Sequence, residues 1–187
     1  MDIRHVLTLI AGMLFLIGFV PYIRAILRGE TKPAKASWLI WASLDSITIV
    51  GMISKNAVNG QIVGAVLGAW IVVVLALIYG TPGWTKLDKR CLGGAVLGIA
   101  LWLAFGEANF GIVTSNIVVF LAAIPTFKSA WSNPSHENRV AWTIFWLSCV
   151  AAVFAIPAMT FEDATQPVVF FLIETTMMYI LYLRPRT

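Results

Sequence analysis

The chain has 187 residues, of which 59% are hydrophobic and 12% are charged, and its formal net charge at pH 7 is +4. Soluble domains have about 45–50% apolar and about 25% charged residues, so this composition excludes an ordinary soluble enzyme, a disordered chain and a disulfide scaffold. No basic stripe interleaved with aromatic residues is present, so we expect no nucleic-acid partner.

Seven apolar segments follow one another along the chain, each close to the length of a helix that crosses a bilayer core of about 30 Å. They are continuous rather than alternating in polarity, which indicates helices and not a β-barrel. The expected limits are residues 5–27, 37–54, 59–80, 91–105, 110–131, 140–160 and 165–183. The sequence therefore predicts an all-α, multi-pass integral membrane protein with seven transmembrane helices.

Lysine and arginine residues lie mostly on one side of the predicted membrane. The poor side holds two, Arg4 and Lys55, and the rich side holds the other eleven. The eleven are Arg24, Arg28, Lys32, Lys35, Lys86, Lys89, Arg90, Lys128, Arg139, Arg184 and Arg186. Because cytoplasmic loops carry the excess of basic residues, we expect the N-terminus outside and the C-terminus in the cytosol, at a plasma or inner membrane.

The first three and the last three segments form a weak repeat with an offset of 104 residues. The offset aligns Pro21 with Pro125 and Trp38 with Trp142. The fourth segment is a linker, and because it crosses once, the two triplets insert in the same direction as parallel repeats. We expect a first three-helix bundle at residues 1–83, a linker helix at 84–108 and a second three-helix bundle at 109–187.

Each triplet carries a proline inside its first helix, Pro21 and Pro125. Proline removes one backbone hydrogen bond and kinks a helix. Two kinks at equivalent depths toward the cytosolic side are natural gating hinges. A static bend is an equally good interpretation, because proline is common in membrane helices.

The segment from Gly18 to Arg28 and its counterpart from Ala123 to Lys128 resemble the proline-bearing first helices of the SWEET and PQ-loop (MtN3-like) transporters. The Asn59-Gly60 start of the third segment is similar to the start of the third SWEET helix, whose asparagine lines the sugar site. The sequence has no Pro-Gln pair, and Asp163-Ala164 stands at the counterpart of Asn59-Gly60. The resemblance implies an alternating-access carrier with a central site between two helix triplets, and it does not fix the solute.

Asp45 and Glu174 lie near the middle of the second and seventh segments. A charged carboxylate at that depth costs at least about 2.5–3.5 kcal/mol on insertion scales, so such residues face a cavity or a partner and often carry function. Three interpretations stay open: they exchange a proton during transport, they hold a cationic or hydroxyl-rich solute, or they are protonated and bond a neighbouring helix.

The predicted substrate-binding residues are Asp45, Glu174, Asn59 and Trp146. Asn59 is equally well explained as a helix cap, and Trp146 as a packing residue. Tryptophans near the segment ends, Trp38, Trp41, Trp84, Trp131 and Trp142, are expected to form an interfacial belt. Gly60, Gly64 and Gly68 recur on one face of the third segment, which predicts close helix packing.

No catalytic, metal-binding or phosphate-binding motif is present, so we expect neither an enzyme nor a metal or other cofactor. The sequence favours a transporter that moves a small polar solute, a sugar or related metabolite, through a midplane site. The alternatives are a seven-helix ligand-binding receptor or sorting protein that does not transport, and a passive channel. The lipid bilayer and the solute are the expected partners, while proton coupling and a homo-oligomer stay open.

Overall fold

A computed structural model describes residues 2–80, 86–106 and 108–184. Within these ranges the chain forms seven α-helices and two short helices and no β-strand, which confirms the predicted all-α class. The helices are α1 (Ile3–Leu27), α2 (Lys35–Ser54), α3 (Gly60–Tyr79), α4 (Lys86–Phe105), α5 (Ala108–Ser132), η1 (Pro134–His136), α6 (Arg139–Phe154), α7 (Phe161–Met178) and η2 (Tyr179–Leu183).

Five of these helical segments are long and apolar enough to cross a membrane: α1, α2, α3, the part of α5 from Ile112 to Ser132, and α7 continued by η2. The apolar helix α6 is shorter, with 16 residues. Large apolar side chains of α1 such as Leu9, Met13 and Ile17 are exposed, as expected for a surface in contact with lipid. The chain is therefore a membrane-embedded protein with five or six helices suited to spanning.

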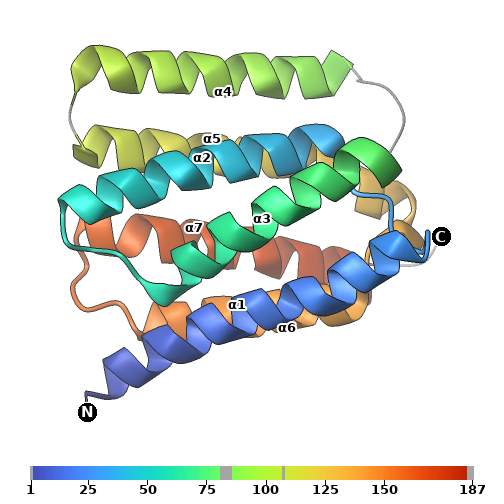
Figure 1. Ribbon diagram of the computed structural model, residues 1–187, viewed down its shortest axis with the longest axis horizontal. Helices are drawn as coiled ribbons and strands as arrows, with labels where there is room; N and C mark the ends of the chain where they lie inside the picture. The colour runs from blue at the N-terminus through green and yellow to red at the C-terminus, as the bar shows by residue number, and fades with distance from the viewer. Residues whose placement is uncertain (1, 81–85, 107, 185–187) are drawn as a thin grey trace.

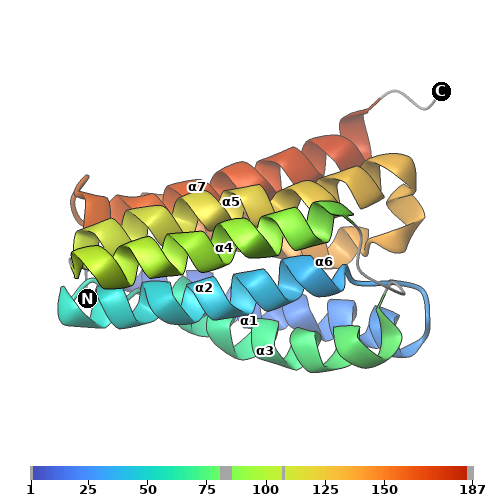
Figure 2. The same ribbon diagram turned by 90° about the horizontal axis from the view of Figure 1, so that it is seen from above.

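The helices lie side by side along the long axis of the molecule (Figure 1). Helix α1 packs against α6 and α3, α2 packs against α5 and α3, and α7 packs against α5 and α6. Helix α4 lies on the outside of the bundle, against α5 and α2 (Figures 1 and 2). The core thus lies between α1, α2, α3 and α5, α6, α7.

The helix limits follow the predicted segments except around the last two helices and the start of α4. Helix α6 ends at Phe154 rather than at residue 160, and Pro157, which has no N–H to continue a helix, follows. Helix α7 begins at Phe161 rather than at residue 165, because the Thr160 hydroxyl accepts a hydrogen bond from Asp163 N. Helix α4 begins five residues earlier than predicted, at Lys86.

Glycines bring α1 and α3 into backbone contact. A Cβ atom added at Gly12 would lie 2.7 Å from the carbonyl oxygen of Gly60, and one added at Gly64 would lie 3.0 Å from that of Gly12. One added at Gly68 would overlap the Phe19 ring. The predicted packing role of Gly60, Gly64 and Gly68 is therefore confirmed.

The connections gather at the two ends of the bundle. At one end, Lys32 N donates to His136 O at 3.4 Å, which joins the α1–α2 connection to η1. At the other end, Arg4 Nη1 donates to Pro157 O at 2.9 Å, which joins the start of α1 to the α6–α7 connection. We call these the lysine end and the N-terminal end.

Candidate functional site: a cavity at the centre of the bundle

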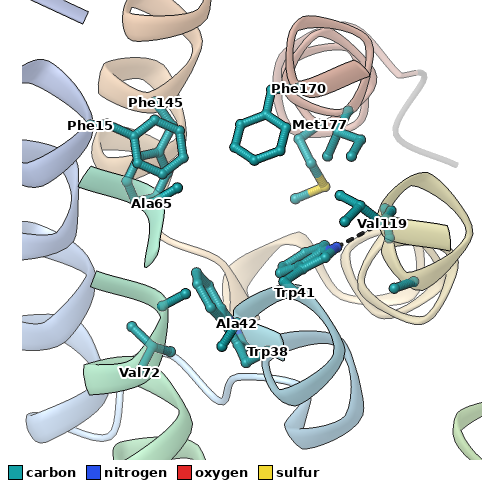
Figure 3. Packing of buried hydrophobic residues seen from close by; sticks show 14 of the residues in the cluster. Phe15, Trp38, Trp41, Ala42, Ala65, Val72, Val119, Phe145, Phe170 and Met177 are labelled. Carbon is teal, nitrogen blue, oxygen red and sulfur yellow. Dashed lines mark hydrogen bonds between the residues drawn. The ribbon is translucent and has the colours of Figure 1, made fainter. Parts of the chain in front are cut away.

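A small cavity lies in the middle of the core, among six of the helices. Its volume is about 40 Å³, enough for roughly two or three water molecules. Aromatic rings from α1, α2, α6 and α7 surround this region (Figure 3). The lining residues are Phe15, Phe19, Trp38, Trp41, Asp45, Ala65, Ala69, Val119, Trp142, Phe145, Phe170, Ile173 and Glu174.

Asp45 and Glu174 both line this cavity, from α2 and α7. Helical periodicity places each acid on the same face as aromatic lining residues, Asp45 with Trp38 and Trp41, and Glu174 with Phe170. Asp45 is 4% exposed and Glu174 is 6% exposed.

One oxygen of each acid, Asp45 Oδ1 and Glu174 Oε2, is buried and has no hydrogen-bond partner among the described residues. A buried acceptor left unpaired costs about 1–3 kcal/mol. Each acid therefore has an acceptor in the core that the described residues do not satisfy.

The three tryptophans of the cavity wall have their N–H groups bonded to protein. Trp41 Nε1 donates to Val119 O at 3.0 Å, a bond drawn in Figure 3. Trp38 Nε1 donates to the Tyr22 hydroxyl at 3.3 Å, and Trp142 Nε1 donates to Glu137 Oε2 at 2.8 Å. These rings therefore present apolar carbon to the cavity.

The predicted interfacial belt is wrong for three of its five members. Trp38, Trp41 and Trp142 are 5%, 7% and 2% exposed, because each indole points into the core and bonds a neighbouring helix or connection there. Trp131 is exposed and stacks under the Arg184 guanidinium, 5.1 Å from its ring centre. Trp84 lies outside the described residues.

A chain of amides closes the core on the side of the N-terminal end. Asn59 Nδ2 donates to Gln166 Oε1 at 2.8 Å, and Gln166 Nε2 donates to Gln61 Oε1 at 3.0 Å. Gln61 Nε2 in turn approaches Ser148 Oγ at 3.3 Å, and Ser148 Oγ donates to Ala11 O at 2.7 Å. We call Asn59, Gln61, Ser148 and Gln166 the glutamine cluster.

The glutamine cluster separates the cavity from a larger hollow. Gln61 lies one helical turn from the cavity-lining Ala65, and Gln166 lies one turn from Phe170. On its other side, Gln61 lines a hollow of about 330 Å³ at the N-terminal end. Both glutamines are fully buried, and they lie along α3 and α7 between residues that line the cavity and the N-terminal end.

A second polar cluster lies behind the cavity wall toward the lysine end. Glu137, in the connection before α6, is 6% exposed and accepts hydrogen bonds from Trp142 Nε1 and, at 3.3 Å, from the Tyr22 hydroxyl. Burial raises the pKa of Glu137 from 4.5 to about 7, while the bonds from Trp142 and Tyr22 favour its charged form. We call Tyr22, Trp38, Glu137 and Trp142 the Glu137 cluster.

Pro21 and Pro125 lie within α1 and α5 as predicted, and their surroundings differ. Proline leaves carbonyl groups of the preceding turn without a donor. In α5, the Ser37 hydroxyl of α2 donates to Ala122 O at 2.9 Å, three residues before Pro125. The residue aligned with Ser37 by the repeat is Ala141, which carries no side-chain donor.

The structure does not bring Asn59 or Trp146 to the cavity that Asp45 and Glu174 line. Asn59 caps α3, accepting from Ile62 N at 3.0 Å, and belongs to the glutamine cluster at the hollow. Trp146 faces α7 and donates from Nε1 to Thr175 Oγ1 at 3.1 Å.

Sequence reasoning missed Gln61, Gln166 and Glu137. The two glutamines had a usable signal, since a polar amide inside an apolar segment is as informative as an acid there. Glu137 had none, because an acid in a short polar connection is ordinary. In the part of the chain that the structure describes, no group of three His, Cys, Asp or Glu residues is placed to hold a metal ion.

Comparison of the chain with models of known protein families, with curated proteins and with solved structures finds no match.

Proposed function

We propose that this protein is a small-solute carrier of the SWEET and PQ-loop type, with seven membrane spans in a 3+1+3 arrangement, that works by alternating access. One observation carries the proposal: a cavity in the core is lined by two buried carboxyl groups and lies between two polar clusters. A carrier needs a site that opens to one side at a time, and a cavity with a barrier toward each end has this form.

The contacts between helices support a repeat of three helices. The pairing of α1 with α6 is matched by that of α5 with α2, and the pairing of α1 with α3 by that of α5 with α7. The 104-residue offset also relates cavity-lining positions, Trp38 to Trp142 and Trp41 to Phe145. A cavity between two such repeats is where transporters of repeated design bind their solute.

In this proposal the two clusters are the gates. The bonds of the glutamine cluster join neutral groups, and such bonds contribute about 1 kcal/mol each on balance, so they break and re-form at low cost. Opening this cluster would join the cavity to the hollow at the N-terminal end. The basic residues place the lysine end, and with it the Glu137 cluster, in the cytosol. Pro21, next to Tyr22, and Pro125 are the hinges.

Solute counterflow in liposomes tests this proposal, because a carrier exchanges solute across the membrane and neither a channel nor a receptor does. The purified protein is reconstituted with radiolabelled glucose, glycine and guanidinium as probes. We expect saturable counterflow of at least one probe, lowered about tenfold or more by Asp45→Asn or Glu174→Gln. Glu30→Gln, at an exposed carboxylate of the lysine end, is the control.

Flux that never saturates would indicate a channel instead. Saturable binding without counterflow would indicate a receptor or sorting protein on the same scaffold. Unchanged counterflow in both acid variants would remove Asp45 and Glu174 from the mechanism.

A further inference from the structure

The polar groups that face the cavity are unbalanced between donors and acceptors. The lining residues include two carboxyl groups and, among the described residues, no Lys, Arg or His. Their three indole N–H groups already donate to Val119 O, Tyr22 and Glu137. Ionised carboxylates only accept hydrogen bonds, and two carboxyl groups that share one proton have a single O–H donor, so the cavity offers more acceptors than free donors.

This imbalance opposes the binding of some classes of solute and favours the binding of others. Every sugar hydroxyl both donates and accepts, and a zwitterion brings a carboxylate that needs donors or a positive charge. In this cavity those acceptors would be buried without partners, at a cost that opposes binding. A solute that only donates hydrogen bonds and carries positive charge brings no acceptor that needs a donor in the cavity.

The apolar part of the wall favours the same class. Seven of the thirteen lining residues are aromatic, from Phe15 and Phe19 on α1 to Phe170 on α7. Aromatic faces attract organic cations through the ring quadrupole, most strongly where water is excluded. A small inorganic cation prefers a shell of several oxygen ligands, and here only two side chains supply oxygen.

We propose that the ligand of this cavity is a small organic cation of the guanidinium or alkylammonium kind, held between Asp45 and Glu174 and walled by aromatic rings. This inference rests on the proposed function for its transport step but not for binding. The N–H groups of the cation donate to the carboxyl groups of Asp45 and Glu174, the two acids that line the cavity. The resemblance does not fix the solute, and the donor and acceptor balance of the cavity favours the cation.

Size and charge fit a compact cation. A volume of about 40 Å³, enough for roughly two or three water molecules, is much closer in size to guanidinium than to a hexose. Two carboxyl groups can hold one proton and one monovalent cation, which leaves the occupied cavity neutral. This balance avoids an uncompensated charge in the hydrocarbon region.

Guanidinium and urea form a matched pair of probes, because both are small and planar and they differ in charge and in the urea oxygen. Binding to the purified, detergent-solubilised protein is followed by the rise in its melting temperature at millimolar probe, with glucose and sodium ion in parallel. We expect a saturable rise with guanidinium and none with urea, glucose or sodium. Asp45→Asn and Glu174→Gln should each weaken guanidinium binding about tenfold or more, and Glu30→Gln should not.

Other results of this binding experiment overturn the inference. Equal effects of urea and guanidinium, or no effect of either, would remove the cation site. A larger effect of glucose than of guanidinium would be compatible with the proposed carrier but would overturn its proposed solute class. An equal effect of sodium would assign the site to an inorganic cation.

The two acid variants replace a carboxyl group by an amide of equal size. The wild-type comparison of guanidinium with urea stands even if a variant fails to fold. Binding of guanidinium without counterflow would support the inference while contradicting the proposed carrier.

Discussion

Glu137 has an unusual position for an acid in a connection between helices. It is buried between the indole of Trp142 and the phenol of Tyr22, and it lies outside the membrane-spanning segments. Its two donors come from helices of different triplets, α6 and α1, so this carboxyl group ties the two halves together at the lysine end. Because the charged form is penalised by burial, the protonation of Glu137 is coupled to the folded state.

The raised pKa of Glu137 predicts a pH-dependent stability. The folded pKa is about 7 and the ordinary value is 4.5, so between these pH values the unfolded chain loses its proton first. The contribution of Glu137 to the free energy of unfolding is therefore fully present below about pH 4.5. It is lost as the pH rises to 7, and the total loss is of order 3 kcal/mol. We expect Glu137→Gln to remove this fall and to be the more stable protein at pH 8.

The melting temperature in detergent, measured from pH 5 to 8, checks this prediction. Glu30→Gln is the matched control, since Glu30 is exposed at the same end of the bundle and its loss should leave the pH dependence unchanged. A slope retained in Glu137→Gln would mean that another group causes it.

At the residue scale, the sequence predicted those site residues whose chemistry is out of place in a span. Asp45 and Glu174 stand out because a carboxylate in hydrocarbon is costly, and both line the cavity. Asn59 was singled out by its resemblance and lies instead in the glutamine cluster. Trp146 was singled out by depth alone, and depth does not tell which way a ring on a helix points.

Among the helices, α1 and α3 make the closest contact, and glycine makes it feasible. Backbone of α3 at Gly60 lies where a side chain at Gly12 would have to be. We expect Gly12→Ala to push the helices apart and to lower stability by about 1–3 kcal/mol, as overpacking does in other cores. Thermal unfolding in detergent measures the change.

Gly93→Ala on α4 is the control for this contact, because a Cβ atom there meets no other heavy atom of the described chain within 4 Å. Alanine is a better helix former than glycine, so this variant should be neutral or more stable. A loss in Gly93→Ala equal to that in Gly12→Ala would assign the effect to glycine in general rather than to the α1–α3 contact.

At the scale of elements, hydropathy predicted where the helices lie but not which of them touch. The apolar segments match the helices because their composition alone decides that they are helical in lipid. The end of α6 and the start of α7 depend on Pro157 and on the Thr160 cap, which an average over apolar residues does not detect. The order of packing, with α3 between α1 and α2, depends on faces of several helices at once.

For the whole molecule, the two polar clusters lie on either side of the cavity, toward the two ends of the bundle. The glutamine cluster draws on α3, α6 and α7, and the Glu137 cluster on α1, α2 and α6. Each cluster therefore crosses between the two triplets, so in the proposed mechanism a separation of the triplets at one end breaks one cluster while the other holds. No single segment of the sequence contains either cluster, which explains why the proposed gates were not predicted from it.

Helix α4 decides the topology of the whole chain. It begins with Lys86, Asp88, Lys89 and Arg90 and is not among the five helices suited to spanning, yet it runs the length of the bundle beside α5. If α4 crosses the membrane, the α1–α2 and α5–α6 connections lie on the same side, as the bond from Lys32 N to His136 O requires within one bundle. We therefore expect seven crossings, with both connections in the cytosol.

Single cysteines in a variant without Cys91 and Cys149 measure this arrangement. Lys55→Cys and Met159→Cys, exposed at the N-terminal end, should react with a membrane-impermeant maleimide on intact cells. Glu30→Cys and Ser135→Cys, exposed at the lysine end, should react only after permeabilisation. Because each half contributes one position to each end, a reversed pattern in the second half alone would show that α4 does not cross, and reversal in both halves would invert the orientation while leaving seven spans.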